Sequence, residues 1–301
     1  MTLRHRAEYF AFALTRAKWR LLPESWAGVA GSVTGALAGS LLRIRRREVE
    51  AHLGVAFPDH DASWRRRVAR QSYRHLGREA AVIFRMAGWR PSDVTSRVRF
   101  EDFEMVDEAV RAGGGVIVLT AHLGNWEVAG AALAARGFPI DVVAKGMSNG
   151  RFEEELDRMR SSLAMSVIPM GEAPRAVLRS LERGRVVALL GDQDAHRGGV
   201  YVPFFGRVAS TPRGPALFAL RKDVPVFVGF AIRDPGGKPT YTLRAHRLTI
   251  ERSGDVDTDV QRLLTEYHRI LEAAIQGAPE QYFWQHRRWK TRPPEEQAPV
   301  R

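Results

Sequence analysis

Residues 114–127, which read GGVIVLTAHLGNWE, decide the fold of this chain of 301 residues. The apolar, β-branched run at 116–119 is typical of a buried strand, and the residues from Trp126 onward are typical of a helix. A strand that leads through a short loop into a helix is the repeating unit of α/β proteins. His122 lies in that loop, at the end of the strand where open α/β sheets place their ligands.

The same alternation continues along the chain. Strands are predicted at residues 116–119, 140–143, 167–168, 186–190, 224–232 and 241–250, and helices near 125–136, 150–163, 173–183, 213–222 and 256–276. The turn signal DPGG at 234–237 joins the last two strands in an antiparallel hairpin. We therefore expect an α/β fold with a mostly parallel central sheet, flanking helices and a C-terminal antiparallel hairpin.

The residues before this α/β region differ in charge. Residues 1–100 contain 19 Lys and Arg against 8 Asp and Glu, whereas the remaining residues contain 27 against 26. An excess confined to one region implies an anionic partner: nucleic acid, a membrane surface or a phosphorylated substrate. Helices are predicted over 5–57, with a break at Pro23, and over 62–89. We divide the chain into a basic, helical, membrane-associating region (1–96), an α/β domain (97–293) and a polar tail (294–301).

Residues 26–42 (WAGVAGSVTGALAGSLL) carry no charge and reach only the lower limit of length for a membrane-spanning helix. Small residues recur at every fourth position, where another helix, or another copy of this one, can pack closely: Ala27, Gly31, Gly35 and Gly39. The arginines within 43–47 can bind an anionic membrane surface. A membrane-lying or membrane-embedded helix and a soluble packed helix both fit this pattern. Peripheral or monotopic attachment fits better than a true span.

His122 and Glu127 form the candidate catalytic pair. Histidine can take up a proton near neutral pH, and a carboxylate at its other ring nitrogen fixes the tautomer. On a regular helix the two side chains would diverge by about 140°. They can meet only if His122 lies in the loop and Glu127 in the first helical turn, with the bend at Gly124 and Asn125. Backbone N–H groups near that bend, or a nearby cation, are the expected donors to an oxyanion.

Further polar residues near the strand ends are candidates for substrate binding: Asn125, Lys145, Arg151, Asp192, Gln193, Asp194 and Arg213. The three residues after the strand 186–190 either bind a substrate or cap the turn. The two cations that follow the strand 140–143 can hold phosphate groups. Arg213, at a helix start, either holds a phosphate or forms a surface salt bridge. We interpret His246, His268 and His286 as structural.

The chain contains no cysteine, which excludes a thiolate nucleophile, a disulfide framework and thiolate metal sites. Its histidines are scattered and form no His-Glu-x-x-His pattern. We expect neither a metal nor an organic cofactor.

Several blocks of sequence together resemble one family. Residues 122–127 (HLGNWE) are similar to the catalytic box of the lipid A biosynthesis (lauroyl/myristoyl) acyltransferase family, which is related to the phosphatidylinositol mannoside acyltransferases and to the glycerol-phosphate acyltransferase superfamily. A downstream block is matched by residues 190–194 (LGDQD), 199–206 (GVYVPFFG) and 210–216 (STPRGPA), and a C-terminal signature by 279–293 (PEQYFWQHRRWKTRP). Lys145 stands where this family more often has an arginine.

The resemblance implies an acyltransferase. It would move a fatty acyl chain from a thioester, of acyl carrier protein or of CoA, to a hydroxyl group of a membrane glycolipid such as a lipid A precursor. A lysophospholipid or a phosphatidylinositol mannoside is the alternative acceptor. In this reaction His122 would be the general base, oriented by Glu127. The expected location is the cytoplasmic face of the bacterial plasma membrane, with peripheral or monotopic attachment.

Other classes of protein remain open from the residues alone. A nucleic-acid-binding protein fits the net charge of +12 and the aromatic and basic residues interleaved at 282–292, although the chain has no RNP-like, helix-turn-helix or zinc-finger pattern. Nucleic acid is therefore not an expected partner. A hydrolase that pairs His122 with a serine would need a Gly-x-Ser-x-Gly elbow, which the chain lacks. A catalytically silent membrane scaffold is the third alternative.

Overall fold

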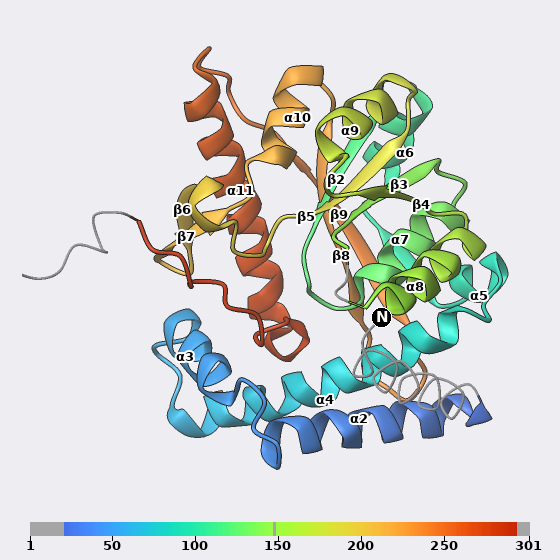
Figure 1. The fold of residues 1–301 in the computed structure, drawn as a ribbon, viewed down its shortest axis with the longest axis vertical. Helices are drawn as coiled ribbons and strands as arrows, with labels where there is room; N and C mark the ends of the chain where they lie inside the picture. The colour runs from blue at the N-terminus through green and yellow to red at the C-terminus, as the bar shows by residue number, and fades with distance from the viewer. Residues whose placement is uncertain (1–20, 147–148, 294–301) are drawn as a thin grey trace, which may run out of the picture.

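The computed structural model describes residues 21–146 and 149–293 (Figure 1). At its centre a seven-stranded sheet has the order β1-β9-β8-β2-β5-β3-β4. β8 and β9 pair antiparallel and the other neighbouring strands pair in parallel. The strands are β1 (Val98–Glu101), β2 (Val116–Thr120), β3 (Ile140–Ala144), β4 (Ser166–Pro169), β5 (Val186–Leu190), β8 (Val226–Arg233) and β9 (Tyr241–Leu248). The expected α/β fold with a mostly parallel sheet and a C-terminal antiparallel hairpin is thus confirmed.

Both faces of this sheet are buried. In β2, Ile117 and Leu119 belong to the buried cluster on one face, whereas Val116 and Val118 belong to the cluster on the other. Successive side chains of a strand point to opposite faces, so a strand covered on both sides must be apolar throughout. This explains why β2 reads as an unbroken apolar run rather than as an alternating one.

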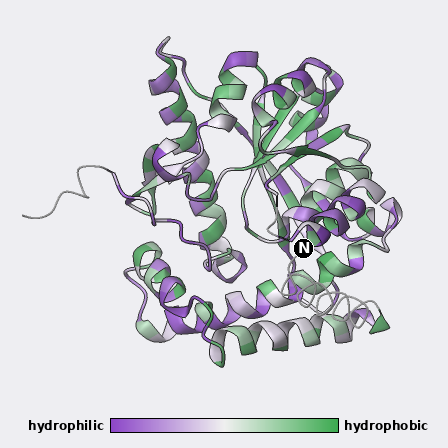
Figure 2. Cartoon of the chain, in the orientation of Figure 1, coloured by the Kyte–Doolittle hydropathy of each residue, from purple (hydrophilic) through white to green (hydrophobic). Residues whose placement is uncertain are grey.

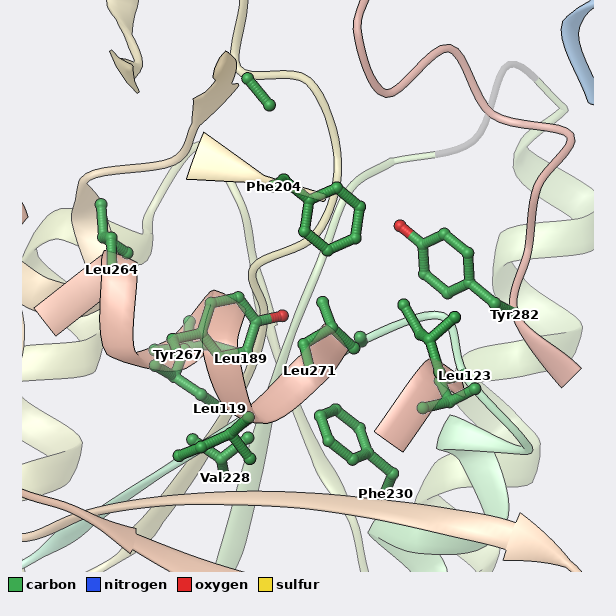
Figure 3. Packing of buried hydrophobic residues seen from close by; sticks show 14 of the residues in the cluster. Leu119, Leu123, Leu189, Phe204, Val228, Phe230, Leu264, Tyr267, Leu271 and Tyr282 are labelled. Atoms are coloured by element: carbon green, nitrogen blue, oxygen red, sulfur yellow. The ribbon is translucent and has the colours of Figure 1, made fainter. Parts of the chain in front are cut away.

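Helices cover the two faces. One face is covered by α9 (Ala173–Glu182), α10 (Gly214–Lys222) and α11 (Val256–Gly277), and the other by α6 (Glu104–Arg111), α7 (Trp126–Ala135) and α8 (Gly150–Ser162). Figure 3 shows how Tyr267 and Leu271 of α11 pack among Leu119, Leu189 and Val228 of the central strands. The carboxyl ends of β2 and β5 remain at one edge of the sheet, which positions the loops that follow them.

The N-terminal helices lie along one end of the sheet. They are α2 (Glu24–Ser40), α3 (Arg46–Ala56), α4 (Ala62–Met86) and the short α5 (Pro91–Thr95). Asp61 caps α4, because its carboxylate accepts the backbone N–H of Trp64 at 2.6 Å. Side chains of α4 join both buried clusters, including Val68 on one face of the sheet and Met86 on the other. This region therefore shares its core with the sheet.

Helices α2 and α4 run side by side and touch through their backbones (Figure 1). A Cβ atom at Gly35 would lie 1.9 Å from the carbonyl oxygen of Tyr73, and one at Gly31 would lie 2.4 Å from that of Gly77. Only glycine permits such an approach. The prediction that the small-residue stripe packs closely against another helix is thus confirmed, and the other helix is α4 of the same chain.

The opposite side of α2 is exposed and apolar. Trp26 is 68% exposed, Val33 53% and Leu37 48%. In Figure 2, α2 is drawn in green and pale tones, whereas α4 carries purple, hydrophilic segments. Within residues 21–146 and 149–293, no helix combines the length and the hydropathy that crossing a bilayer requires.

Two features of the fold differ from the sequence prediction. Strand β1 was not expected, and it extends the sheet by pairing in parallel with β9. A separate two-stranded antiparallel sheet is formed by β6 (Val200–Phe204) and β7 (Arg207–Thr211), flanked by the 3-10 helix η1 (His196–Gly198). A second such helix, η2 (Pro279–Gln281), begins the C-terminal segment. The helix predicted before residue 21 and the tail 294–301 lie outside the described residues.

Candidate active site

The register of two neighbouring strands creates the candidate site. β2 and β5 pair in parallel, with Thr120 opposite Leu190 at their carboxyl ends. His122 and Asp192 each follow two residues later, so both chains carry a chemically active side chain to the same point. This is the edge at which open α/β sheets bind ligands.

His122 and Asp192 are joined by two hydrogen bonds. The imidazole Nδ1 lies 2.8 Å from Asp192 Oδ1, and the backbone N–H of His122 donates to Oδ2 at 3.0 Å. The aspartate side chain is fully buried, whereas 14% of the histidine side chain is exposed. Burial alone would raise the pKa of Asp192, but attraction to His122 and the hydrogen bonds from it outweigh burial and hold that pKa well below its usual value. An ionised Asp192 fixes the proton of a neutral His122 on Nδ1.

Nε2 of His122, the nitrogen left with a lone pair, lies on the exposed side of the imidazole, next to Gln193. The side-chain amide nitrogen of Gln193 lies 3.3 Å from it. The rings of Trp126 and Phe283 flank the imidazole, with centroids 4.7 Å and 5.9 Å away. An imidazole held in this way can accept a proton from a hydroxyl group that replaces the Gln193 amide.

The loop that carries His122 is fixed by its backbone. Gly124 has a φ of +64°, and a Cβ there would lie 2.0 Å from the carbonyl oxygen of Ala231. Its N–H donates to the carbonyl of Gln281 at 3.1 Å, and the N–H of Asn125 donates to the carbonyl of Ala231 at 3.0 Å. Both groups are therefore occupied. The expectation that they stabilise an oxyanion is wrong.

Asn125 does not face the mouth of the site. The residue is 1% exposed, and its Oδ1 accepts the N–H of Val128 at 3.0 Å as the cap of α7. Its Nδ2 donates to Glu79 at 2.8 Å. Because both ends of the amide have protein partners and the residue is buried, its predicted role in substrate binding is wrong.

Glu127 is paired with an arginine instead of with His122. Its two carboxylate oxygens accept hydrogen bonds from Arg160 of α8, at 2.6 Å and 3.0 Å. Both side chains are nearly buried, at 8% and 13% exposure. Glu127 does lie in the first turn of α7, as expected, but it turns away from the loop. The prediction that it orients His122 is wrong, and Asp192 occupies that position.

The remaining candidates separate into two groups. Lys145 is exposed directly after β3, at the same edge of the sheet, and Arg151 is exposed in the first turn of α8. Asp194, by contrast, accepts the N–H and the hydroxyl of Thr291 at 3.2 Å and 2.9 Å, which ties the C-terminal segment down. Arg213 forms an exposed salt bridge of 2.9 Å with Asp257, the structural alternative for this residue.

The histidines that we interpreted as structural divide by burial. The ring of His268 lies between the carbonyl of Pro203, 2.7 Å away, and the guanidinium of Arg288, 3.0 Å away. The ring of His286 contacts the carbonyl of Asp192 at 3.1 Å. Burial lowers the pKa of His286 to about 4 and that of His268 to about 3. His246 is exposed on β9.

An apolar cavity lies beneath the site, between the sheet and α7. Its free volume is about 60 Å³, the space of a few methylene groups. Trp126 lines the cavity, and its ring also contacts the imidazole of His122, so this one side chain connects the cavity with the site. The other lining residues include Gly130 and Leu133 of α7, Val142 of β3 and Met165 after α8, together with the Glu127–Arg160 pair.

Two parts of this site were missed in the sequence. Asp192 was expected to contact substrate rather than His122, although its distance from the end of β5 equals that of His122 from the end of β2. Arg160 was not singled out, because a charged residue on an amphipathic helix carries no signal of its own. A search for the carboxylate two residues beyond the neighbouring strand would have identified the first of these.

Comparisons with known proteins find relatives over most of the chain. A family model described as bacterial lipid A biosynthesis acyltransferase matches residues 1–291. The lipid A biosynthesis palmitoleoyltransferase of Escherichia coli (strain K12) is 30% identical over 284 residues, which cover 91% of this chain and 88% of that protein. The phosphatidylinositol mannoside acyltransferase of Mycolicibacterium smegmatis is 28% identical over 263 residues, 83% of each chain. The lipid A biosynthesis myristoyltransferase of E. coli is 24% identical over 277 residues, 89% of this chain and 82% of the other.

Proposed function

Because this chain belongs to the bacterial lipid A biosynthesis acyltransferase family and is an acyltransferase, we propose that it moves a fatty acyl chain from a thioester of acyl carrier protein or CoA to a hydroxyl group of a membrane glycolipid such as a lipid A precursor. The observation that carries the proposal is the 2.8 Å contact between His122 Nδ1 and the buried Asp192. It leaves Nε2 as a base at the edge of the sheet. A phosphatidylinositol mannoside is the second candidate acceptor, supported by the relative from M. smegmatis.

The reaction needs one proton relay. His122 Nε2 removes the proton of the acceptor hydroxyl while its oxygen attacks the thioester carbonyl carbon. The tetrahedral oxyanion collapses, the carbon–sulfur bond breaks, and the leaving thiolate takes the proton back from the imidazolium. Asp192 remains ionised throughout and stabilises that imidazolium. General-base assistance of this kind contributes about 10²–10⁴ in rate.

The acyl chain of the donor enters the cavity beside Trp126. The lining is mostly apolar, which suits a hydrocarbon chain, although the Glu127–Arg160 pair also contributes to it. Trp126 connects this lining with the imidazole that must meet the thioester. Its free volume is smaller than a long acyl chain, so the walls must move apart on binding. Met165 is suited to that movement, because methionine side chains are flexible and fill irregular gaps.

The headgroups bind at the exposed rim. Gln193 contacts Nε2 and is exposed, which places it where the acceptor hydroxyl must arrive. Lys145 and Arg151 lie exposed beyond β3, on the adjacent part of the edge, and hold the phosphate groups of the donor. Both parts of this assignment rest on position and charge.

The protein lies on the cytoplasmic face of the bacterial plasma membrane, with the outer side of α2 in the lipid interface. Trp26, Val29, Val33 and Leu37 expose an apolar face along this helix. Arg43, Arg45 and Arg47 are exposed beyond its carboxyl end, where they meet anionic headgroups. A lipid surface accounts for apolar and basic residues side by side, whereas nucleic acid would account only for the charge.

Product analysis tests the proposed reaction. The purified protein is incubated with total bacterial membrane lipid and with labelled acyl carrier protein or labelled acyl-CoA in separate reactions, and the lipids are analysed by mass spectrometry. We expect one lipid to gain a single acyl group from at least one donor, and the His122→Ala variant, with folding verified, to lose this activity. Release of free fatty acid alone, no acylated lipid with either donor, or an unaffected His122→Ala variant would overturn the proposal.

A further inference from the structure

Glu79 is a buried carboxylate on the side of α4 that faces the sheet. Its side chain is 4% exposed. Oε1 accepts a hydrogen bond from Arg233 at 2.9 Å, whereas Oε2 accepts one from Tyr241 at 2.6 Å and one from Asn125 at 2.8 Å. Three parts of the chain that are distant in sequence therefore meet at one carboxylate.

The charges of this cluster balance. Arg233 is the one guanidinium within salt-bridge distance of Glu79 among the described residues, and it is equally buried, at 4% exposure. His75 lies 3.9 Å from Glu79, and burial lowers its pKa, so it is neutral at physiological pH. A buried carboxylate with a charged partner and two neutral donors is fully satisfied, whereas removal of its charge leaves the arginine without a counter-ion.

The cluster reaches the loop that carries His122. Asn125 can cap α7 only when its oxygen points at the N–H of Val128, and its hydrogen bond to Glu79 fixes the amide in that orientation. One turn earlier on the same side of α4, His75 contacts the carbonyl of Gly124 at 3.3 Å. Helix α4 thus holds two consecutive residues of the loop from below, and its other side holds α2.

We propose that Glu79 is a positioning residue for His122. Through Asn125 it fixes the loop between β2 and α7, and it thereby sets the position of the imidazole relative to the thioester and the acceptor hydroxyl. The assignment rests on the proposed function of His122 as the base. The alignment of this base would then depend on a carboxylate of the N-terminal helices, which lies outside the sequence blocks that contain His122 and Asp192.

Exchanging the two partners tests the contact. Glu79→Gln leaves Arg233 without a counter-ion, and Asn125→Asp places two carboxylates against each other. In the double variant Glu79→Gln with Asn125→Asp, an amide at 79 donates to a carboxylate at 125, and that aspartate still caps α7. We expect each single change to lower kcat by about tenfold or more, with KM changed by less than about threefold. The double variant should recover part of the lost rate, because it restores the contact between residues 79 and 125 but leaves Arg233 without a carboxylate at 79.

Two further measurements separate positioning from stability. Amide hydrogen exchange over the loop between β2 and α7 should quicken in both single variants and slow again in the double variant, whether or not acyl transfer is the reaction. Asp141→Asn is the matched control, because this buried aspartate binds Arg185 at 2.6 Å where β3 begins, away from the site. It should lower the urea midpoint and leave kcat per folded molecule unchanged.

The outcomes decide between a positioning role and a purely structural one. A folded Glu79→Gln variant with the kcat of the parent, or a double variant no faster than the product of the two single effects, would overturn the proposal. If Glu79→Gln does not fold, Tyr241→Phe removes one donor and keeps the ion pair; it should lower kcat about two- to fivefold, and an unchanged kcat and loop exchange would also overturn it. If the parent transfers no acyl group, unchanged loop exchange still refutes the role of Glu79, and altered exchange confines the failure to the proposed reaction.

Discussion

The α2–α4 helix pair and the loop that carries His122 are held in opposite ways. The helix pair depends on the absence of side chains, because backbone meets backbone at Gly31 and Gly35, and its outer face is merely apolar. In the loop, by contrast, the side chains of His122 and Asn125 form specific hydrogen bonds with other side chains and with the backbone. The difference indicates that the role of the helix pair depends on the general apolar character of its outer face, which many sequences can supply. The role of the loop depends on the positions of individual atoms.

The largest expected effect comes from Asp192, the carboxylate that binds His122 from the end of β5. Asp192→Asn keeps the shape of the side chain but no longer fixes the proton on Nδ1, so kcat should fall by about 10³–10⁴. Asp194→Asn is the matched control two residues away, because its carboxylate binds Thr291 instead of His122. Steady-state rates of acyl transfer measure both variants. Equal losses in the two would contradict a special role for Asp192.

The helix pair should break at its glycines. Gly35→Ala places a Cβ 1.9 Å from a carbonyl oxygen of α4, and the backbones must separate, which should cost about 3 kcal/mol of unfolding free energy. Gly54→Ala in α3 is the control, since a Cβ there meets nothing within 4 Å and the helix should gain up to about 1 kcal/mol. Urea unfolding distinguishes them, and two variants of equal stability would refute the close packing.

Mild acid should lower the free energy of unfolding, because the buried His268 stays neutral in the folded protein. His268 is neutral in the folded protein, with a pKa of about 3, but binds a proton below its ordinary pKa once unfolded. The contribution of His268 to the free energy of unfolding is therefore fully present above about pH 6.5. It falls as the pH drops toward 3, by about 2 kcal/mol near pH 5. His268→Asn should lose correspondingly less between neutral pH and pH 5 in urea unfolding. An identical pH dependence in both proteins would exclude this histidine as the cause.

The smallest expected effect concerns the outer face of α2. Trp26→Ser should weaken binding to vesicles of anionic phospholipid by about tenfold, since about 1.5–3 kcal/mol of burial is at stake for a large apolar side chain. Val256→Ser, at a similarly exposed apolar position of α11, should leave binding unchanged. Vesicle co-sedimentation reports both. A loss shared by the two variants would mean that α2 has no special contact with lipid.

Much of the fold was predictable from the sequence. The central strands are buried on both faces and therefore appear as apolar runs between helical stretches. The glycine stripe of α2 indicates a close contact with another helix. Strand β1 (Val98–Glu101) was missed because it is short and only Val98 is buried. The β6–β7 pair was missed because Pro203 and Gly206 interrupt its pattern.

The candidate site was predicted in part. The strand–loop–helix pattern located His122 correctly at the sheet edge, and Asp192 was correctly expected nearby. Which carboxylate would face the imidazole depends on the order of the strands, because β5 must lie beside β2 for Asp192 to reach it. Glu127 is nearer in sequence, but the helix directs it toward Arg160. Sequence spacing alone therefore does not show whether Glu127 or Asp192 contacts His122.

The tautomer of His122 tests the central claim most directly. A nitrogen-15 NMR spectrum of the histidine side chains, assigned by comparison with the His122→Gln variant, shows which ring nitrogen carries the proton in the neutral form. With Asp192 bound to Nδ1, the proton must lie on Nδ1, and Nε2 must show the shift of an unprotonated nitrogen. A neutral His122 protonated on Nε2 would have no lone pair to accept the acceptor's proton, and it would contradict the assignment of this residue as the base.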